Sequence, residues 1–141
     1  MAIQFNKETG VFVLETKSTM YQMKVGDYGV LLHLYYGKKV GDCELSYLVQ
    51  MYDRGFSGQI PEAGNRREFS TDTLLLEYPT YGTGDYRTEA LRVVDENGGY
   101  ATDLRYVSHE ILKGKYQLDG LPSMYANEEE LVYLLLPHLH T

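Results

Sequence analysis

The chain has 141 residues, of which 43% are hydrophobic and 23% are charged, so it is long enough for one domain with a buried core. Its formal net charge of −7 argues against nucleic-acid binding, because a basic surface is the usual footprint of that function. The N-terminus lacks the apolar core of a signal peptide, and no run reaches the ~18 apolar residues of a membrane span, so we expect a cytoplasmic protein with no membrane partner.

The composition also indicates the type of secondary structure. The chain contains 14 tyrosines and no tryptophan, and tyrosine favours strands because its apolar ring packs while its hydroxyl reaches water. Cys43 is the only cysteine, which excludes an intrachain disulfide, and its neighbours Asp42 and Glu44 offer no positive charge to activate the thiol. We therefore expect a β-rich chain in which Cys43 has a structural role.

The first part of the chain predicts two β-hairpins. Residues 2–5 and 11–16 alternate around a turn, and residues 20–25 and 29–36 do the same around Gly26-Asp27-Tyr28. Strict alternation divides the side chains of the fourth strand between two faces. One face is expected to hold Leu32, Leu34 and Tyr36, and the other Leu31, His33 and Tyr35.

The middle of the chain combines short strands with a long polar loop. Residues 47–51 predict a strand, whereas residues 53–71 contain scattered glycines and arginines with little periodicity. A loop of this length without secondary structure is uncommon in a compact domain and is often functional. Residues 74–78 predict the strand that leads out of this loop.

The segment 77–87 has the most unusual composition. Pro79, Gly82 and Gly84 require a turn, and the same segment carries three tyrosines and the charged residues Asp85 and Arg87. Such a mixture indicates either a rigid aromatic corner or part of a polar binding surface.

The last third of the chain predicts further antiparallel strands. Residues 90–94 and 100–107 flank Asn97-Gly98, which supplies the positive φ that a tight hairpin needs. Residues 108–116 continue as a strand, and residues 130–136 predict either a final strand or a helical turn. About nine to eleven short strands with regularly spaced turns indicate an all-β fold, an antiparallel β-sandwich that forms one domain.

Several motifs occur in an order that resembles one protein family. They are His33-Leu34-Tyr35-Tyr36-Gly37-Lys38-Lys39, Asp53-Arg54-Gly55-Phe56-Ser57, the segment 77–87, Thr102-Asp103-Leu104-Arg105-Tyr106-Val107-Ser108-His109, Gly114-Lys115 and Leu118-Asp119-Gly120-Leu121-Pro122. This series resembles the N-terminal domain of the family 36 glycoside hydrolases, the retaining α-galactosidases. The resemblance covers residues 3–125, whereas the apolar segment 131–141 departs from it.

The resemblance implies a fold and an activity. In this family the N-terminal domain is a large β-sandwich of the supersandwich type, placed before a catalytic (β/α)8 barrel. Retaining hydrolysis uses two carboxylates about 5–5.5 Å apart, and in this family they belong to the barrel. Because the barrel lies outside these residues, and no spacing of Asp53, Asp72, Asp85 and Asp103 marks such a pair, we expect no catalytic residue, no cofactor and no activity from this chain alone. Galactosides of the melibiose or raffinose type would be bound through the barrel.

The resemblance also implies candidate substrate-binding residues. Loops of the N-terminal domain in this family reach the substrate pocket, including that of another subunit. On this basis Asp53 and one of Arg66 or Arg67 are candidates for sugar contacts. The alternative is that they form a solvated loop or an ion pair at a domain interface. For Asp85 and Arg87, a structural link within the turn is favoured over sugar binding.

The histidines give weaker indications. His33 and His109 lie within apolar strands, where a half-buried packing role is more common than a ligand role. His138 and His140 alternate near the end of the chain, but no cysteine or third ligand joins them, so we expect no metal site.

Three functions stay open. The segment 131–141 does not continue the sandwich, so sheet edges are expected to be open, and open edges pair with other chains. We therefore expect a homo-oligomer. The chain would either shape the active-site entrance of an α-galactosidase and support its assembly, or act as an independent carbohydrate-binding module, or serve as a purely structural oligomerisation domain. The lack of tryptophan argues against the second function, because tryptophan offers the best stacking face for a sugar.

Overall fold

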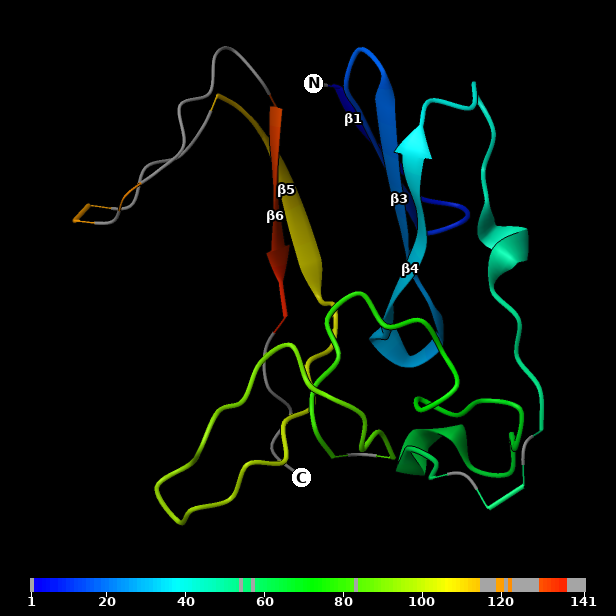
Figure 1. Ribbon diagram of the computed structural model, residues 1–141, viewed down its shortest axis with the longest axis vertical. Coiled ribbons are helices and arrows are strands. Elements are labelled where there is room, and N and C mark those ends of the chain that lie inside the picture. The colour runs from blue at the N-terminus through cyan, green and yellow to red at the C-terminus, as the bar shows by residue number, and fades with distance from the viewer. Residues whose placement is uncertain are drawn as a thin grey trace.

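The computed structural model describes residues 2–53, 55–56, 58–82, 84–114, 119–120, 122 and 130–136. In these residues six strands form two antiparallel sheets, and three short 3-10 helices lie in the connections. Figure 1 shows the two sheets side by side, with the irregular middle of the chain below them. The all-β class is therefore confirmed, although the described strands are fewer than we predicted.

The first sheet contains four strands in chain order. They are β1 (Ala2–Asn6), β2 (Val11–Glu15), β3 (Thr19–Val25) and β4 (Leu31–Lys38), and each pairs antiparallel with the next. The first turn closes at Gly10, which has a φ of 70° and donates its N–H to the carbonyl of Asn6 at 2.9 Å. Both predicted hairpins are confirmed by this register.

Strand β4 departs from strict alternation at Leu34. The pairing of β3 with β4 shifts between Gln22 and Met23, and Leu34 is the extra residue of the resulting β-bulge. Leu34 is buried, whereas Tyr36 is 69% exposed. The prediction that Leu34 and Tyr36 share one face is therefore wrong, because the bulge shifts the alternation by one residue.

The second sheet consists of β5 (Ser108–Lys113) and β6 (Glu130–Leu135), which pair antiparallel. Of the two alternatives for residues 130–136, the strand is confirmed. The predicted strand 108–116 is confirmed as far as Lys113, and its last two residues lie outside the described part of the chain.

One apolar cluster joins the two sheets. Phe12, Met23 and Leu31 are buried on the first sheet, and they are packed by Leu134 of β6 and by Tyr106, which lies just before β5. The ring of His109 also lies in this contact, 4.3 Å from that of Phe5 and 4.7 Å from that of Phe12. The predicted packing role of His109 is therefore confirmed.

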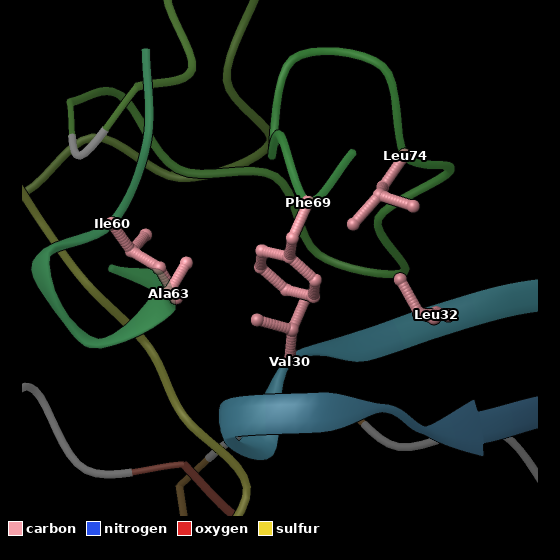
Figure 2. Packing of buried hydrophobic residues seen from close by; sticks show 6 residues of the cluster. All are labelled: Val30, Leu32, Ile60, Ala63, Phe69 and Leu74. Carbon is pink, nitrogen blue, oxygen red and sulfur yellow. The ribbon is translucent and has the colours of Figure 1, made fainter. Parts of the chain in front are cut away.

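A second cluster forms between β4 and the irregular middle of the chain (Figure 2). Its buried members are Val30, Leu32, Ile60, Ala63, Phe69 and Leu74. Four of them come from the segment that the sequence marked as polar or as its exit strand. The predicted loop thus has a buried apolar side, and a short 3-10 helix, η3 (Pro61–Ala63), turns the chain over this core.

The segment that follows β4 is attached through the side chain of Gln22. This residue is fully buried, donates from Nε2 to the carbonyl of Cys43 at 2.7 Å, and accepts from the N–H of Leu45 at 3.0 Å. The segment then forms a 3-10 helix, η2 (Ser46–Leu48), so the predicted strand at residues 47–51 is wrong. Cys43 itself is exposed.

Three other predicted strands, at residues 74–78, 90–94 and 100–107, are also wrong. Residues 74–78 contain only an isolated bridge from Leu76 to Leu32, supported by a 2.8 Å hydrogen bond from the N–H of His33 to the carbonyl of Leu75. At residues 90–107 the predicted turn exists, because the N–H of Gly98 donates to the carbonyl of Asp95 at 3.1 Å and the N–H of Asp95 donates to the carbonyl of Gly99 at 2.8 Å. No strand ladder flanks this turn.

Candidate functional site

The first candidate site is built around an ion pair between Asp53 and Arg67. Arg67 Nε lies 3.1 Å from Asp53 Oδ2, and the N–H of Gly55 donates to Asp53 Oδ1 at 2.9 Å. The side chains of Arg67 and Asp53 are 65% and 48% exposed. Both charges are therefore tied to each other and still open to solvent, where an exposed pair adds little to stability.

Phe56 lies beside this pair in an uncommon conformation. Its φ is 54°, directly after Gly55 with a φ of 63°, and its side chain is fully exposed. A left-handed conformation costs a non-glycine residue about 1–2 kcal/mol, and a bare phenylalanine gains nothing from burial. Phe56 was not among the site residues predicted from the sequence, although an aromatic residue directly after a loop glycine was the available signal.

These residues surround an open depression. It measures about 610 Å³ and is lined by Asp53, Gly55, Phe56, Gln59, Gly64, Asn65 and Arg67. The lining combines a carboxylate acceptor, guanidinium donors, two side-chain amides and an aromatic ring. This combination suits a polyhydroxylated ligand, because hydroxyls pair with the polar groups while the apolar face of a sugar ring covers the aromatic group.

Arg66 does not line the depression, although it precedes Arg67. Its Nη1 donates to Asp27 Oδ2 at 2.7 Å and its Nε donates to Glu68 Oε1 at 3.0 Å. The guanidinium carbon also lies 5.8 Å from the ring centre of Tyr28. The structure thus brings Asp53 and Arg67 together and turns Arg66 away from them. Arg54, which the sequence places in the same loop, lies outside the described residues.

The second candidate segment, residues 78–87, is held in place by hydrogen bonds from Arg87. Arg87 donates from Nε to Asp85 Oδ1 at 2.9 Å and from Nη2 to the carbonyls of Thr71 at 2.9 Å and Leu74 at 3.0 Å. Asp85 is only 2% exposed. Burial would raise the pKa of Asp85, but the hydrogen bonds from the side chain and backbone of Arg87 outweigh it and hold this pKa below its ordinary value. The predicted structural link is confirmed.

The tyrosines of this segment form an aromatic corner. The ring centre of Tyr81 lies 5.4 Å from that of Tyr86 and 5.1 Å from that of Tyr100, at interplanar angles of 77° and 44°. Rings at such angles pack on one another and do not form a common flat platform. Of the two interpretations of segment 77–87, the rigid aromatic corner is the one that these contacts support.

The two candidate segments touch through their backbones. A Cβ on Gly58 would lie 2.5 Å from the Cα of Gly84, and a Cβ on Gly84 would lie 2.9 Å from the carbonyl of Gly58. Such distances are shorter than any real Cβ contact, so only glycine fits on either side. The loop that carries the depression and the aromatic corner therefore meet at a pair of glycines.

The remaining predicted residues are histidines, and the first of them, His33, lies among packed polar side chains. His33 Nδ1 lies 3.1 Å from Glu77 Oε2 and 3.4 Å from the hydroxyl of Tyr21, at a half-buried position, so its packing role is confirmed. Burial raises the pKa of Glu77 above its ordinary value. In the part of the chain that the structure describes, no group of three or more His, Cys, Asp or Glu side chains is arranged to hold a metal ion. His138 and His140 lie outside that part.

No helix among the described residues has the length and apolar character needed to cross a membrane.

Comparison with known protein families gives a match over most of the chain. The model of the glycosyl hydrolase family 36 N-terminal domain matches residues 29–137. The match therefore includes most of the segment 131–141 that we had set apart from the family pattern.

Curated relatives point the same way. The chain is 48% identical over 130 residues to the bifunctional alpha-galactosidase/sucrose kinase AgaSK of Mediterraneibacter gnavus, covering 92% of this chain and 14% of that protein. It is 42% identical over 130 residues to alpha-galactosidase AgaA of Geobacillus stearothermophilus, covering 92% of this chain and 18% of the relative. The chain thus spans less than a fifth of the length of these two relatives.

Solved structures agree with the fold. The galactosidase domain of AgaSK superposes with a TM-score of 0.89 at 44% identity, covering 96% of this chain and 19% of that one. AgaB from Geobacillus stearothermophilus superposes with a TM-score of 0.81 at 42% identity, covering 96% of this chain and 18% of its own. Since the family model covers well over half of the residues, the chain belongs to the N-terminal domain family of the family 36 glycosyl hydrolases.

Proposed function

We propose that this chain is the non-catalytic N-terminal part of an α-galactosidase that hydrolyses terminal α-galactosides of the melibiose or raffinose type. In this proposal the depression beside Asp53 and Arg67 forms one wall of the entrance to the substrate site, and the rest of the enzyme supplies the catalytic carboxylates. The named activity of the relatives supports the reaction, and a structure of Geobacillus stearothermophilus AgaA in complex with raffinose supports the substrate class.

Phe56 is the observation that carries the proposed role of the loop. A fully exposed phenylalanine in a left-handed conformation is unfavourable for the isolated chain. Exposed, strained residues cluster at ligand-binding positions, where the surroundings hold them ready for a contact. The adjacent Asp53 and Arg67 add polar partners that suit sugar hydroxyls.

We also propose that the assembled enzyme is a cytoplasmic homo-oligomer. Exposed apolar side chains directly precede Asp53 in the chain and support this proposal, because such a surface favours burial against another chain. These side chains are Tyr47, Leu48, Met51 and Tyr52.

The kinetics of an enzyme that carries this chain test the role of the loop. This carrier enzyme is the α-galactosidase with this chain at its N-terminus, for example AgaSK in which the matched 130 residues are replaced by it. We expect Phe56→Ala, Asp53→Asn and Arg67→Met each to raise the KM for raffinose about fivefold or more with kcat within about twofold, since they remove binding without touching the chemistry. Arg92→Met is the matched control, because Arg92 is an exposed arginine that instead lies over the ring of Tyr100.

Unchanged KM values in all three variants would reject the role of the loop. The purely structural oligomerisation domain would then be the favoured function. The isolated chain tests the second function, an independent carbohydrate-binding module. In a galactose titration followed by NMR, shifts at Gly55 and Phe56 would mean that the chain binds sugar alone as a carbohydrate-binding module. Light scattering on the same sample reports whether the chain associates.

A further inference from the structure

Arg66 connects the loop that carries the depression to the body of the first sheet. Its Nη1 donates to Asp27 Oδ2 at 2.7 Å, across 39 positions of sequence. Its Nε donates to Glu68 Oε1 at 3.0 Å, and its guanidinium carbon lies 5.8 and 5.9 Å from the ring centres of Tyr28 and Phe69. One side chain thus joins the connection between β3 and β4 to the end of the loop.

The partners of Arg66 belong to a well-fixed part of the molecule. Asp27 and Tyr28 lie in the short 3-10 helix η1 (Asp27–Gly29), and the carbonyl of Tyr28 accepts a hydrogen bond from buried Arg105 at 3.1 Å. The Tyr28 ring meets that of Phe69 at 4.9 Å, and Phe69 is a central member of the apolar cluster in Figure 2. The partners of Arg66 are therefore themselves held by hydrogen bonds and by packing against the buried cluster.

Arg66 and Arg67 are consecutive, so the anchoring of one limits where the other can point. The carbonyl of Arg66 accepts from Gln59 Nε2 at 3.1 Å, and Gln59 itself lines the depression. Arg67 leaves this anchored backbone in the other direction and meets Asp53 at 3.1 Å. The side chain of Arg66 joins this part of the loop to the β3–β4 connection through Asp27 and also through Tyr28, whose hydroxyl lies 3.4 Å from Arg66 Nη1.

We propose that Arg66 is a positioning residue, which sets the affinity for galactosides by holding Arg67 and Asp53 at the depression without touching the sugar. This inference rests on the proposed function, because it assigns a role at the same site. It requires an arginine at this position. The forked guanidinium donates to two carboxylates and covers two rings at once, whereas a lysine ammonium is a single point charge that cannot do all of this.

The test is a double-mutant cycle in the carrier enzyme. If Arg66 acts through Arg67, then Arg66→Met and Arg67→Met each raise the KM for raffinose, and the double variant raises it no more than Arg67→Met alone. Asp27→Asn, which changes the support outside the depression, raises KM in the same direction with kcat unchanged. Arg66→Lys is the milder variant. We expect its log KM to recover less than half of the increase that Arg66→Met causes. Fold-changes that multiply in the double variant, or an unchanged KM in Arg66→Met, would overturn the proposal.

NMR of the 141-residue chain separates this inference from the proposed function. The N–H of Gly55 donates to Asp53 Oδ1 and so reports on the ion pair. We expect Arg66→Met and Asp27→Asn to shift this resonance, and Arg92→Met to leave it unchanged. If the resonance shifts but Arg67→Met has no effect on KM, the proposed function fails and the positioning of the pair stands. If the resonance does not shift in Arg66→Met while Arg67→Met raises KM, the positioning role fails and the proposed function stands.

Discussion

Gly84 tolerates no side chain, because its backbone touches that of Gly58. A Cβ on Gly84 would meet the carbonyl of Gly58 at 2.9 Å, and its φ is 89°. We expect Gly84→Ala to lower the free energy of unfolding by about 2–4 kcal/mol, from the left-handed conformation and the overlap together. Urea denaturation of the chain, followed by circular dichroism, measures this loss.

Gly98 provides the matched control. Its φ of 83° is similar, but a Cβ there would meet nothing within 4 Å. Gly98→Ala should therefore cost only the conformational part, about 1–2 kcal/mol. Equal losses in the two variants would show that the contact between Gly58 and Gly84 has no energetic effect.

Asp85 predicts a dependence of stability on pH. Its pKa is lowered in the folded chain, so the contribution of its pair with Arg87 is complete above the unfolded pKa, about 3.9, and is lost as pH falls through the folded value. Asp85→Asn should lower the free energy of unfolding at pH 7 by about 1–3 kcal/mol. The variant should also lose less stability than the parent chain below about pH 4. Urea titrations at several pH values give both quantities, and parallel curves for the two proteins would contradict the expectation.

The segment after β4 depends on one buried amide. Gln22 donates to the carbonyl of Cys43 and accepts from the N–H of Leu45, so Gln22→Leu leaves two backbone groups without these partners. Each unsatisfied group costs about 1–3 kcal/mol, partly offset by apolar burial, and we expect a net loss of about 2–4 kcal/mol. Hydrogen exchange should show faster exchange at Leu45 than in the parent chain.

Gln4→Leu is the control for this substitution. Gln4 lies on the same sheet but is exposed, so the variant should change stability by less than about 0.5 kcal/mol. If Gln22→Leu exchanges no faster at Leu45, the segment is held by the apolar packing of Leu45 instead.

Sequence patterns predicted those strands whose partners are close in the chain. Strands β1 to β4 alternate and are joined by short turns, so local pattern and pairing agree. Residues 74–78 have the same apolar character, yet they only bridge to β4 at Leu76 because Leu74 turns into the cluster around Phe69. The bulge at Leu34 depends on the pairing with β3 and leaves no sign in the local sequence.

The candidate site was predictable only in part. The composition of the loop after Asp53 indicated a polar surface, and Asp53 and Arg67 do meet there. Sequence could not separate Arg66 from Arg67, because the choice depends on Asp27, which is far away in the chain and near in space. The exposure of Phe56 follows from the left-handed backbone at Gly55 and Phe56, which residue type alone does not determine.

The molecule as a whole has two apolar clusters on opposite sides of β4. The consecutive residues Leu31 and Leu32 divide between them, Leu31 toward the second sheet and Leu32 toward the irregular segment. We expect Leu31→Ala and Leu32→Ala each to cost about 2–5 kcal/mol and to preserve a single unfolding transition. Tyrosine fluorescence and circular dichroism in urea should give coincident curves. Separate transitions would mean that the two clusters unfold independently.

The glycine contact has a consequence for protein engineering. Because Gly58 and Gly84 meet backbone to backbone, the loop with the depression and the aromatic corner fit each other as a matched set. Grafting the loop alone from one relative into another would place a foreign backbone against an unadapted corner. A chimaera designed to exchange substrate preference should therefore transplant residues 53–87 as one block, with both glycines included.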